Sequence, residues 1–134
     1  RNIMANPNIV AVTSILGKTT YLTPTGTSAV VLLPNAASSG NVFKINQIVA
    51  ANTSASAVNS TVAVYTNGAV AQGSAPSGGT AYPIASAISV PGNASLVVVD
   101  KTSAIYLEEG TSISITSGVA NNLTFSISYE QISS

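Results

Sequence analysis

Residues 123–130, LTFSISYE, decide the fold class of this chain because apolar and polar side chains alternate along them. Successive side chains of a β-strand point to opposite faces, so this period of two predicts a strand with one buried and one hydrated face. The same alternation recurs in residues 112–116 (SISIT) and 61–65 (TVAVY). The expected buried face comprises Leu123, Phe125, Ile127 and Tyr129, and the hydrated face Thr124, Ser126, Ser128 and Glu130.

Apolar and β-branched runs, bounded mostly by Gly, Pro or Asn, predict the remaining strands. These runs cover residues 9–15, 29–33, 42–51, 85–90, 96–99 and 105–107. The wholly apolar runs 29–33 and 96–99 predict strands that are covered on both faces or lie next to a partner chain. No segment combines helix-forming residues with helical spacing. We therefore expect an all-β, single-domain antiparallel β-sandwich, jelly-roll or immunoglobulin-like, with about eight to ten strands.

One domain is expected to span residues 1–134, a length that suits a single hydrophobic core. Residues 1–8 are expected to form an N-terminal arm, and Met4 resembles a natural start, which would make residues 1–3 a leader. Residues 68–80 (GAVAQGSAPSGGT) predict a flexible loop, which could be a mobile hairpin or an arm between subunits. The apolar runs are far shorter than the ~20 residues of a membrane-spanning helix, and residues 9–16 lack the flanks of a signal peptide. No membrane association is expected.

Charge is scarce and balanced. Only 6% of the residues are charged, and four basic side chains offset four acidic ones. A protein that binds nucleic acid usually carries a clustered basic face, so no nucleic-acid partner is expected. A net charge near zero also leaves little repulsion between copies, which favours self-association.

The chain contains no His and no Cys, which removes the usual base of a serine nucleophile and the preferred ligands of zinc. A Ser–Lys dyad remains conceivable, but lysines lie near serines by chance in so Ser-rich a chain. The adjacent Glu108 and Glu109 would point to opposite faces of a strand, and they are better explained as a charged strand end before a turn at Gly110. We therefore predict no catalytic residues, no metal-binding residues, no cofactor and no enzymatic activity.

Two further residue sets allow more than one interpretation. The five tyrosines are candidates for a sugar-stacking or base-stacking surface, but we expect most of them to pack in the core or at an interface. Four Asn-x-Ser/Thr sequons predict asparagines on accessible turns, although chance alone accounts for about as many in such a chain. The tyrosines are Tyr21, Tyr65, Tyr82, Tyr106 and Tyr129, and the sequons begin at Asn52, Asn59, Asn93 and Asn122.

Strand-and-turn motifs over about two-thirds of the chain resemble those of small virion proteins of tailed bacteriophages, especially T4-like phages of marine cyanobacteria. The matching motifs are a strand ending at Asn52, then TVAVY (61–65), ISVP (88–91), LVVVD (96–100), IYLEEGTSI (105–113) and SYEQIS (128–133). This resemblance implies a structural role in a virion and supplies no catalytic residues to carry over.

We expect a non-enzymatic structural component of the virion, such as a capsid decoration protein or a neck or tail accessory protein. It would assemble as a homo-oligomer, for example a trimer, and contact other virion proteins. Because few charges are available to blunt strand edges, we expect those edges to be closed by partner subunits or covered by the N-terminal segment. The alternative is a carbohydrate- or receptor-binding adhesin module of a phage fibre, with its recognition surface on residues 68–82 around Tyr82.

Overall fold

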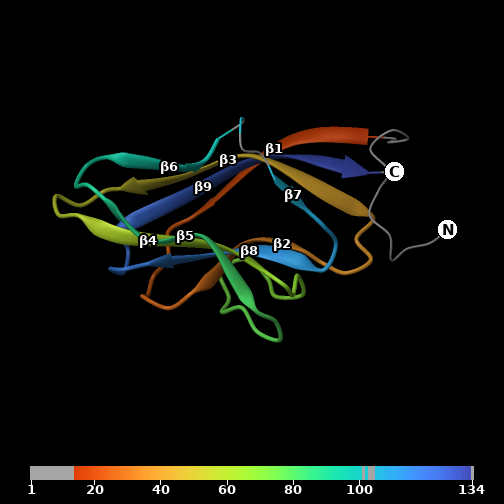
Figure 1. Cartoon of the computed structure of the whole chain (residues 1–134), viewed down its shortest axis with the longest axis horizontal. Helices are drawn as coiled ribbons and strands as arrows, with labels where there is room; N and C mark the ends of the chain where they lie inside the picture. Colours follow the sequence, from red (N-terminus) through yellow and green to blue (C-terminus); the bar gives the residue numbers. More distant parts are fainter. Residues whose placement is uncertain (1–13, 101, 103–104, 134) are drawn as a thin grey trace.

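The computed structural model describes residues 14–100, 102 and 105–133, and these residues form an all-β structure without an α-helix. The expected fold class and strand number are confirmed (Figure 1). The strands are β1 (Ser14–Leu22), β2 (Val30–Asn35), β3 (Asn41–Asn52), β4 (Val58–Tyr65), β5 (Ala81–Val90), β6 (Ser95–Val99), β7 (Ile105–Leu107), β8 (Thr111–Ser117) and β9 (Leu123–Ser133). The N-terminal arm expected over residues 1–8 lies outside the described residues.

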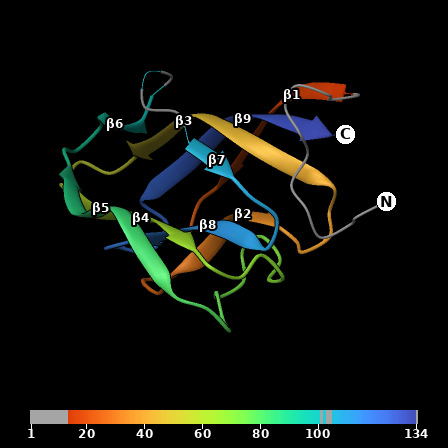
Figure 2. The same ribbon diagram turned by 45° about the vertical axis from the view of Figure 1, so that its right-hand side comes forward.

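Two antiparallel sheets pack face to face and appear as the upper and lower layers of Figure 1. Sheet A has the order β1-β9-β3-β6, with the short β7 also pairing with β3, and sheet B has the order β2-β8-β4-β5. β6 and β7 pair with successive parts of β3, so together they form one interrupted edge strand. The first strand lies beside the last and β2 lies beside β8, with connections that cross between the layers (Figure 2). This order is that of a jelly roll rather than an immunoglobulin-like sandwich.

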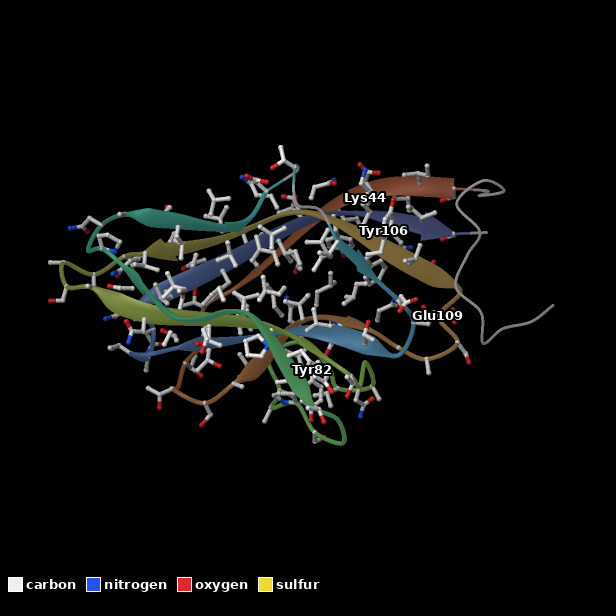
Figure 3. All side chains as sticks on the ribbon, in the orientation of Figure 1. Lys44, Tyr82, Tyr106 and Glu109 are labelled. Carbon is white, nitrogen blue, oxygen red and sulfur yellow. The ribbon has the colours of Figure 1, made fainter. Side chains whose placement is uncertain are left out.

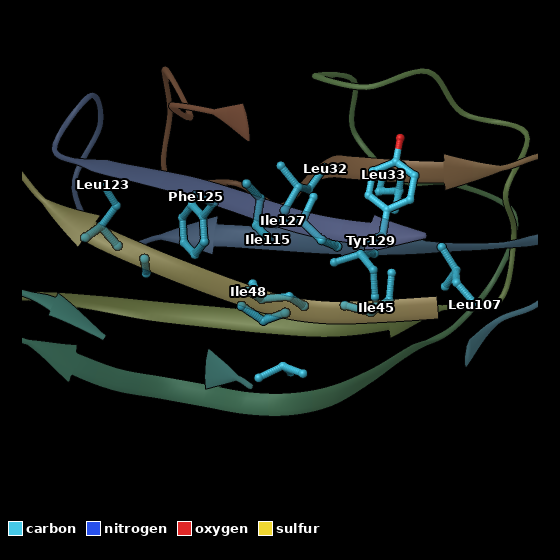
Figure 4. Close-up of a cluster of buried hydrophobic side chains, with 14 of the residues drawn as sticks. Leu32, Leu33, Ile45, Ile48, Leu107, Ile115, Leu123, Phe125, Ile127 and Tyr129 are labelled. Carbon is cyan, nitrogen blue, oxygen red and sulfur yellow. The ribbon is translucent and has the colours of Figure 1, made fainter. Parts of the chain in front are cut away.

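The hydrophobic core fills the space between the sheets. The fully buried side chains of β9 that contribute to it are Leu123, Phe125 and Ile127, and Tyr129 joins them with its ring 5.0 Å from that of Phe43. Figure 4 shows these side chains meeting residues of β2 and β8 from the opposite sheet. Each large aliphatic side chain buried in this way contributes about 1.5–3 kcal/mol. The alternation expected for residues 123–130 is therefore confirmed on its apolar face.

The alternation expected around Ile113 and Ile115 is wrong in one respect. Both isoleucines point into the core, but Ser112 and Ser114 on the other face of β8 are buried as well. β8 is an inner strand of sheet B, and the connection between β4 and β5 lies over its outer face, where the Ser112 hydroxyl donates to the Asn67 carbonyl at 3.0 Å. A serine whose hydroxyl finds a backbone acceptor can be buried without the cost of an unpaired polar group.

Three strand boundaries differ from expectation. β1 passes through Gly17, and β2 includes Pro34, which is tolerated because β2 is the end strand of sheet B. β5 starts at Ala81, four residues before the apolar run that predicted it. The apolar run of β2 is buried on both faces, as expected, whereas Val97 in β6 is left 50% exposed by the described residues.

Two buried asparagines fasten the ends of the sandwich. The Asn35 amide donates to the carbonyls of Asn41 at 3.1 Å and Leu107 at 3.0 Å, which ties together the ends of β2, β3 and β7. The side-chain amide of Asn52 donates to the carbonyls of Ser56 at 2.8 Å and Val90 at 3.0 Å. These hydrogen bonds join the ends of β3 and β5. Asn52 begins a sequon, so the prediction of an accessible asparagine is wrong there.

Candidate functional site: strand edges and an uncharged sheet

The described part of the chain contains no pocket, and no group of His, Cys, Asp and Glu in it is placed to hold a metal ion. None of its segments is a helix of the length and hydrophobicity needed to cross a membrane. The surfaces that remain for function are the sheet faces and the free strand edges.

The acidic pair lies in the turn between β7 and β8. Glu108 is exposed, whereas Glu109 is half-buried and its carboxylate accepts a hydrogen bond from the Gly40 amide. Gly110 adopts a φ of +78°, which an L-residue rarely adopts, so the expected turn is confirmed. Glu109 therefore joins the β7–β8 turn to the β2–β3 turn, and the two carboxylates have different surroundings.

The two lysines in the described part lie on different faces of sheet A. Lys18 pairs with Tyr129 across β1 and β9, which places it on the core-facing side of β1, where it remains exposed. Lys44 pairs with Glu130 on one side and Tyr106 on the other and belongs to the outer face of sheet A. The cross-strand partners of both lysines are thus residues other than serine.

The five tyrosines divide into two groups. Only Tyr65 and Tyr129 are buried, so core packing holds for two of the five, and packing of the others at an interface stays a prediction. Tyr21, Tyr82 and Tyr106 are 70%, 61% and 50% exposed. Figure 3 shows Tyr106 beside Lys44 on the upper layer and Tyr82 on the lower one, and Tyr21 belongs to β1 of sheet A. The exposed tyrosines therefore do not form one stacking platform, and Tyr82 is the only one of them on sheet B.

The free edge of β2 is covered by the chain itself. Within the connection of residues 66–80, Gly73 donates to the Val31 carbonyl at 2.8 Å and the Val31 amide donates to the Ser74 carbonyl at 2.9 Å. The side-chain amide of Gln72 donates to the Leu32 carbonyl at 2.9 Å and to the Thr20 hydroxyl at 3.0 Å. These hydrogen bonds join β2 to β1 of the opposite sheet. At Val31 and Leu32 this edge is covered by the connection after β4, and the covering of strand edges by a partner or by the N-terminal segment stays a prediction. The predicted loop over residues 68–80 has these hydrogen bonds, and its flexibility stays a prediction.

The edge formed by β1 is regular but carries a charge. β1 pairs with β9 along all nine of its residues without a register shift, and no other described strand pairs with it. Ile15 and Leu16 are about half exposed on its opposite faces. Lys18 lies at its centre, and a charged residue there opposes pairing of the edge with another strand.

The edge formed by β5 is irregular and uncharged. Pro83 has no amide proton to donate, and Ala87 adopts a φ of +51°. The pairing with β4 shifts register twice, once on each side of Val62. Proline and bulges of this kind prevent the addition of a further strand. Side chains rather than backbone groups are therefore available for contacts at β5.

The charged residues are distributed unequally between the two sheets. The charged residues within strands are Lys18, Lys44 and Glu130, and all three belong to sheet A. Asp100, Glu108 and Glu109 lie in the connections that flank β7. Residues 45–99 contain no charged side chain, and neither do β2 and β8, so sheet B and the connection over its outer face are wholly uncharged. An ordinary protein surface is about one-quarter to one-third charged.

The largest exposed part of this uncharged half is residues 71–89. None of these residues is buried, and all except Pro76 and Ala85 are exposed. Tyr82, Ile84 and Ile88 present apolar side chains that are 61%, 38% and 42% exposed. Sequence analysis singled out Tyr82 but missed the two isoleucines, because Ile88 belonged to an apolar run expected to form a strand and Ile84 lay outside every predicted strand.

No family model, curated protein or solved structure matches this chain.

Proposed function

We propose that this protein is a non-enzymatic structural component of a tailed phage particle that acts by self-assembly and by contacts with other particle proteins. The observation that carries the proposal is the uncharged, largely exposed segment 71–89, whose apolar side chains are suited to burial against protein. The strand-and-turn motifs that resemble those of small virion proteins support the location in a virion.

The fold is compatible with this role. Jelly rolls are a common architecture of viral capsid proteins, although they also occur in lectins and in other proteins, so this support is an analogy. The hydrogen bonds of Asn35 and Asn52 at the ends of the sandwich suit a component that must hold its shape within a particle.

Light scattering coupled to gel filtration, together with native mass spectrometry at tens of micromolar protein, tests self-assembly. We expect a defined oligomer, and a monomer throughout this range would contradict the proposal. Electron microscopy of intact particles tests the location. A high copy number on the shell would indicate a decoration protein, and a low copy number on the tail axis would indicate a neck or tail protein.

A carbohydrate- or receptor-binding module of a phage fibre is the second candidate. Tyr82 favours it, because this ring is 61% exposed and follows an uncharged loop, so that it is accessible to a ligand. A glycan array and a host-cell pull-down test this function. Binding that is lost in Tyr82→Ala and kept in Tyr21→Ala would establish it.

A further inference from the structure

We infer that Asn67 and Gly68 form a self-modification site, where the Gly68 amide nitrogen attacks the Asn67 side-chain amide whenever the connection after β4 leaves the sandwich. Asn67 is the only asparagine in the chain that a glycine follows. Glycine has no Cβ to shield its nitrogen and adopts conformations that other residues rarely adopt, so this pair closes an imide ring more readily than any other asparagine pair in the sequence. The inference goes beyond the proposed function because it requires neither a partner nor a particle.

The reaction needs only the chain itself and one water molecule. The Gly68 nitrogen forms a bond to Asn67 Cγ, the Cγ–Nδ2 bond breaks, and the departing group leaves as ammonia with the proton of the Gly68 amide. Water then opens the five-membered imide at one of its two carbonyls. Opening at Cγ gives an aspartyl residue. Opening at the backbone carbonyl gives an isoaspartyl linkage, in which the main chain runs through Cβ and Cγ.

Three hydrogen bonds hold Asn67 in place in the folded protein. Its side-chain amide donates to the Ser77 carbonyl at 2.8 Å, and its Oδ1 accepts from the Ala69 amide at 3.0 Å. Its backbone carbonyl accepts from the Ser112 hydroxyl at 3.0 Å. Attack at Cγ turns the planar side-chain amide into a tetrahedral centre and expels Nδ2, so the hydrogen bond to Ser77 must break. The folded arrangement therefore opposes the reaction.

The surroundings of Gly68 oppose the reaction as well. Gly68 is buried, and a Cβ on it would collide with the carbonyl oxygens of Asn35 and Thr111. Ring closure replaces the proton on the Gly68 nitrogen with Cγ and turns the adjoining backbone, which these two carbonyls resist. The reaction is thus confined to molecules in which the connection has opened, and its rate follows the fraction of such molecules.

The products would keep the connection from returning to its place. A carboxylate at position 67 has no proton to donate to the Ser77 carbonyl, and it would be the first charged group within residues 45–99. The isoaspartyl linkage lengthens the main chain by one carbon directly beside the tightly packed Gly68. Because the same connection covers Ser112 and the β2 edge at Val31, the reaction converts a transient opening into a lasting one.

Peptide mapping by mass spectrometry during incubation at mildly alkaline pH tests the site. The conversion of Asn67 is compared between the folded wild type and the wild type in urea, with the exposed Asn59 and Asn93 as internal controls. We expect Asn67 to react first in urea, and at least ~30-fold more slowly in the folded protein. Faster reaction at a control asparagine in urea, or equal rates of Asn67 in the two states, would overturn the inference.

Two variants test whether opening of the connection controls the rate. Ser112→Ala removes a hydrogen bond that holds Asn67, whereas Ser126→Ala removes a half-buried hydroxyl from the outer face of sheet A. We expect Ser112→Ala to speed the reaction of the folded protein about 5-fold, and Ser126→Ala to change it less than ~2-fold. Equal rates in the two variants would overturn the dependence on opening.

The consequence of the reaction is measured on Asn67→Asp, which reproduces the aspartyl product. Asn93→Asp is the matched control, because it adds the same charge at an exposed turn. Hydrogen exchange followed by NMR should show faster exchange of the Val31 and Gly73 amides in Asn67→Asp and wild-type exchange in Asn93→Asp. If Asn67→Asp fails to fold, modified wild type separated by ion exchange takes its place. Unchanged exchange of both amides would overturn the lasting opening.

Discussion

Gly68 lies directly against the carbonyl group of Asn35, so that a Cβ built on Gly68 would be 2.0 Å from the Asn35 oxygen and 2.6 Å from the oxygen of Thr111. The Asn35 carbonyl also accepts a hydrogen bond from the Gly110 amide at 2.8 Å, which limits how far it can move. The connection after β4 therefore crosses the ends of β2 and β8 at a distance that only glycine permits.

Gly68→Ala is expected to destabilise the fold by about 2–3 kcal/mol, because the new methyl group must displace backbone that is held on both sides. The control is Gly26→Ala, where a Cβ would meet nothing within 4 Å. Urea unfolding of both variants measures the difference. Equal midpoints for the two variants would show that the connection can move away from β2 at little cost.

Asn35→Ala is expected to cost about 2–3 kcal/mol, because it removes the side-chain amide that donates to the Leu107 carbonyl at a buried site and to the Asn41 carbonyl beside it. Asn59→Ala, which alters an exposed asparagine in β4, should change stability by less than about 0.5 kcal/mol. Chemical unfolding compares the two. If Asn35→Ala lowers the free energy of unfolding no more than the control does, water replaces the side-chain amide as the hydrogen-bond donor.

Gln72→Ala is expected to loosen the covering of the β2 edge more than it lowers global stability. The variant loses the hydrogen bonds to Leu32 and Thr20, and the neighbouring amides of Val31 and Gly73 should exchange with solvent faster. Hydrogen exchange followed by NMR measures this change. Gln47→Ala, at an exposed position on sheet A, should leave both exchange rates as they are in the wild type.

Tyr129→Phe is expected to change the stability at alkaline pH. Burial raises the pKa of the Tyr129 hydroxyl above its ordinary value of 10.0, because the apolar surroundings disfavour the phenolate. The folded state therefore holds this proton more tightly than the unfolded state does. The resulting stabilisation is fully present below pH 10.0 and is lost as the pH rises through the higher folded-state pKa.

Stability measured from pH 8 to pH 11 checks this expectation. The wild type should lose stability above about pH 10, and Tyr129→Phe should lose less of it. Tyr21→Phe is the matched control at an exposed ring and should follow the wild type. The same alkaline loss in Tyr129→Phe and the wild type would assign it to other groups.

Much of the fold could be predicted from local pattern. Alternation from Leu123 to Tyr129 identified a strand with a buried face, since the period of a strand is visible in any sequence that covers one face only. The apolar run of β2 identified a strand buried on both faces. The order of the strands depends on contacts between distant residues, such as the pairing of Ser14 with Ser133, and no local pattern contains that information.

The candidate surface was harder to predict because it depends on what covers each residue. Ser112 looks like a surface residue until the connection after β4 passes over it, and Ile88 looks like a core residue until β5 proves to be an edge. The scarcity of charge was visible in the composition. The confinement of the described charged residues to sheet A and the connections beside β7 emerged only when the strands were assigned to sheets.

The uncharged character of sheet B also determines how the molecule responds to its medium. Residues 45–99 contain no Asp, Glu, Lys, Arg, His or Cys side chain. Dissolved ions have no charge pair to screen in this half of the sandwich. Contacts made through sheet B would therefore depend on shape complementarity and on the exclusion of water. They would persist from acidic to mildly alkaline pH and from low to high ionic strength.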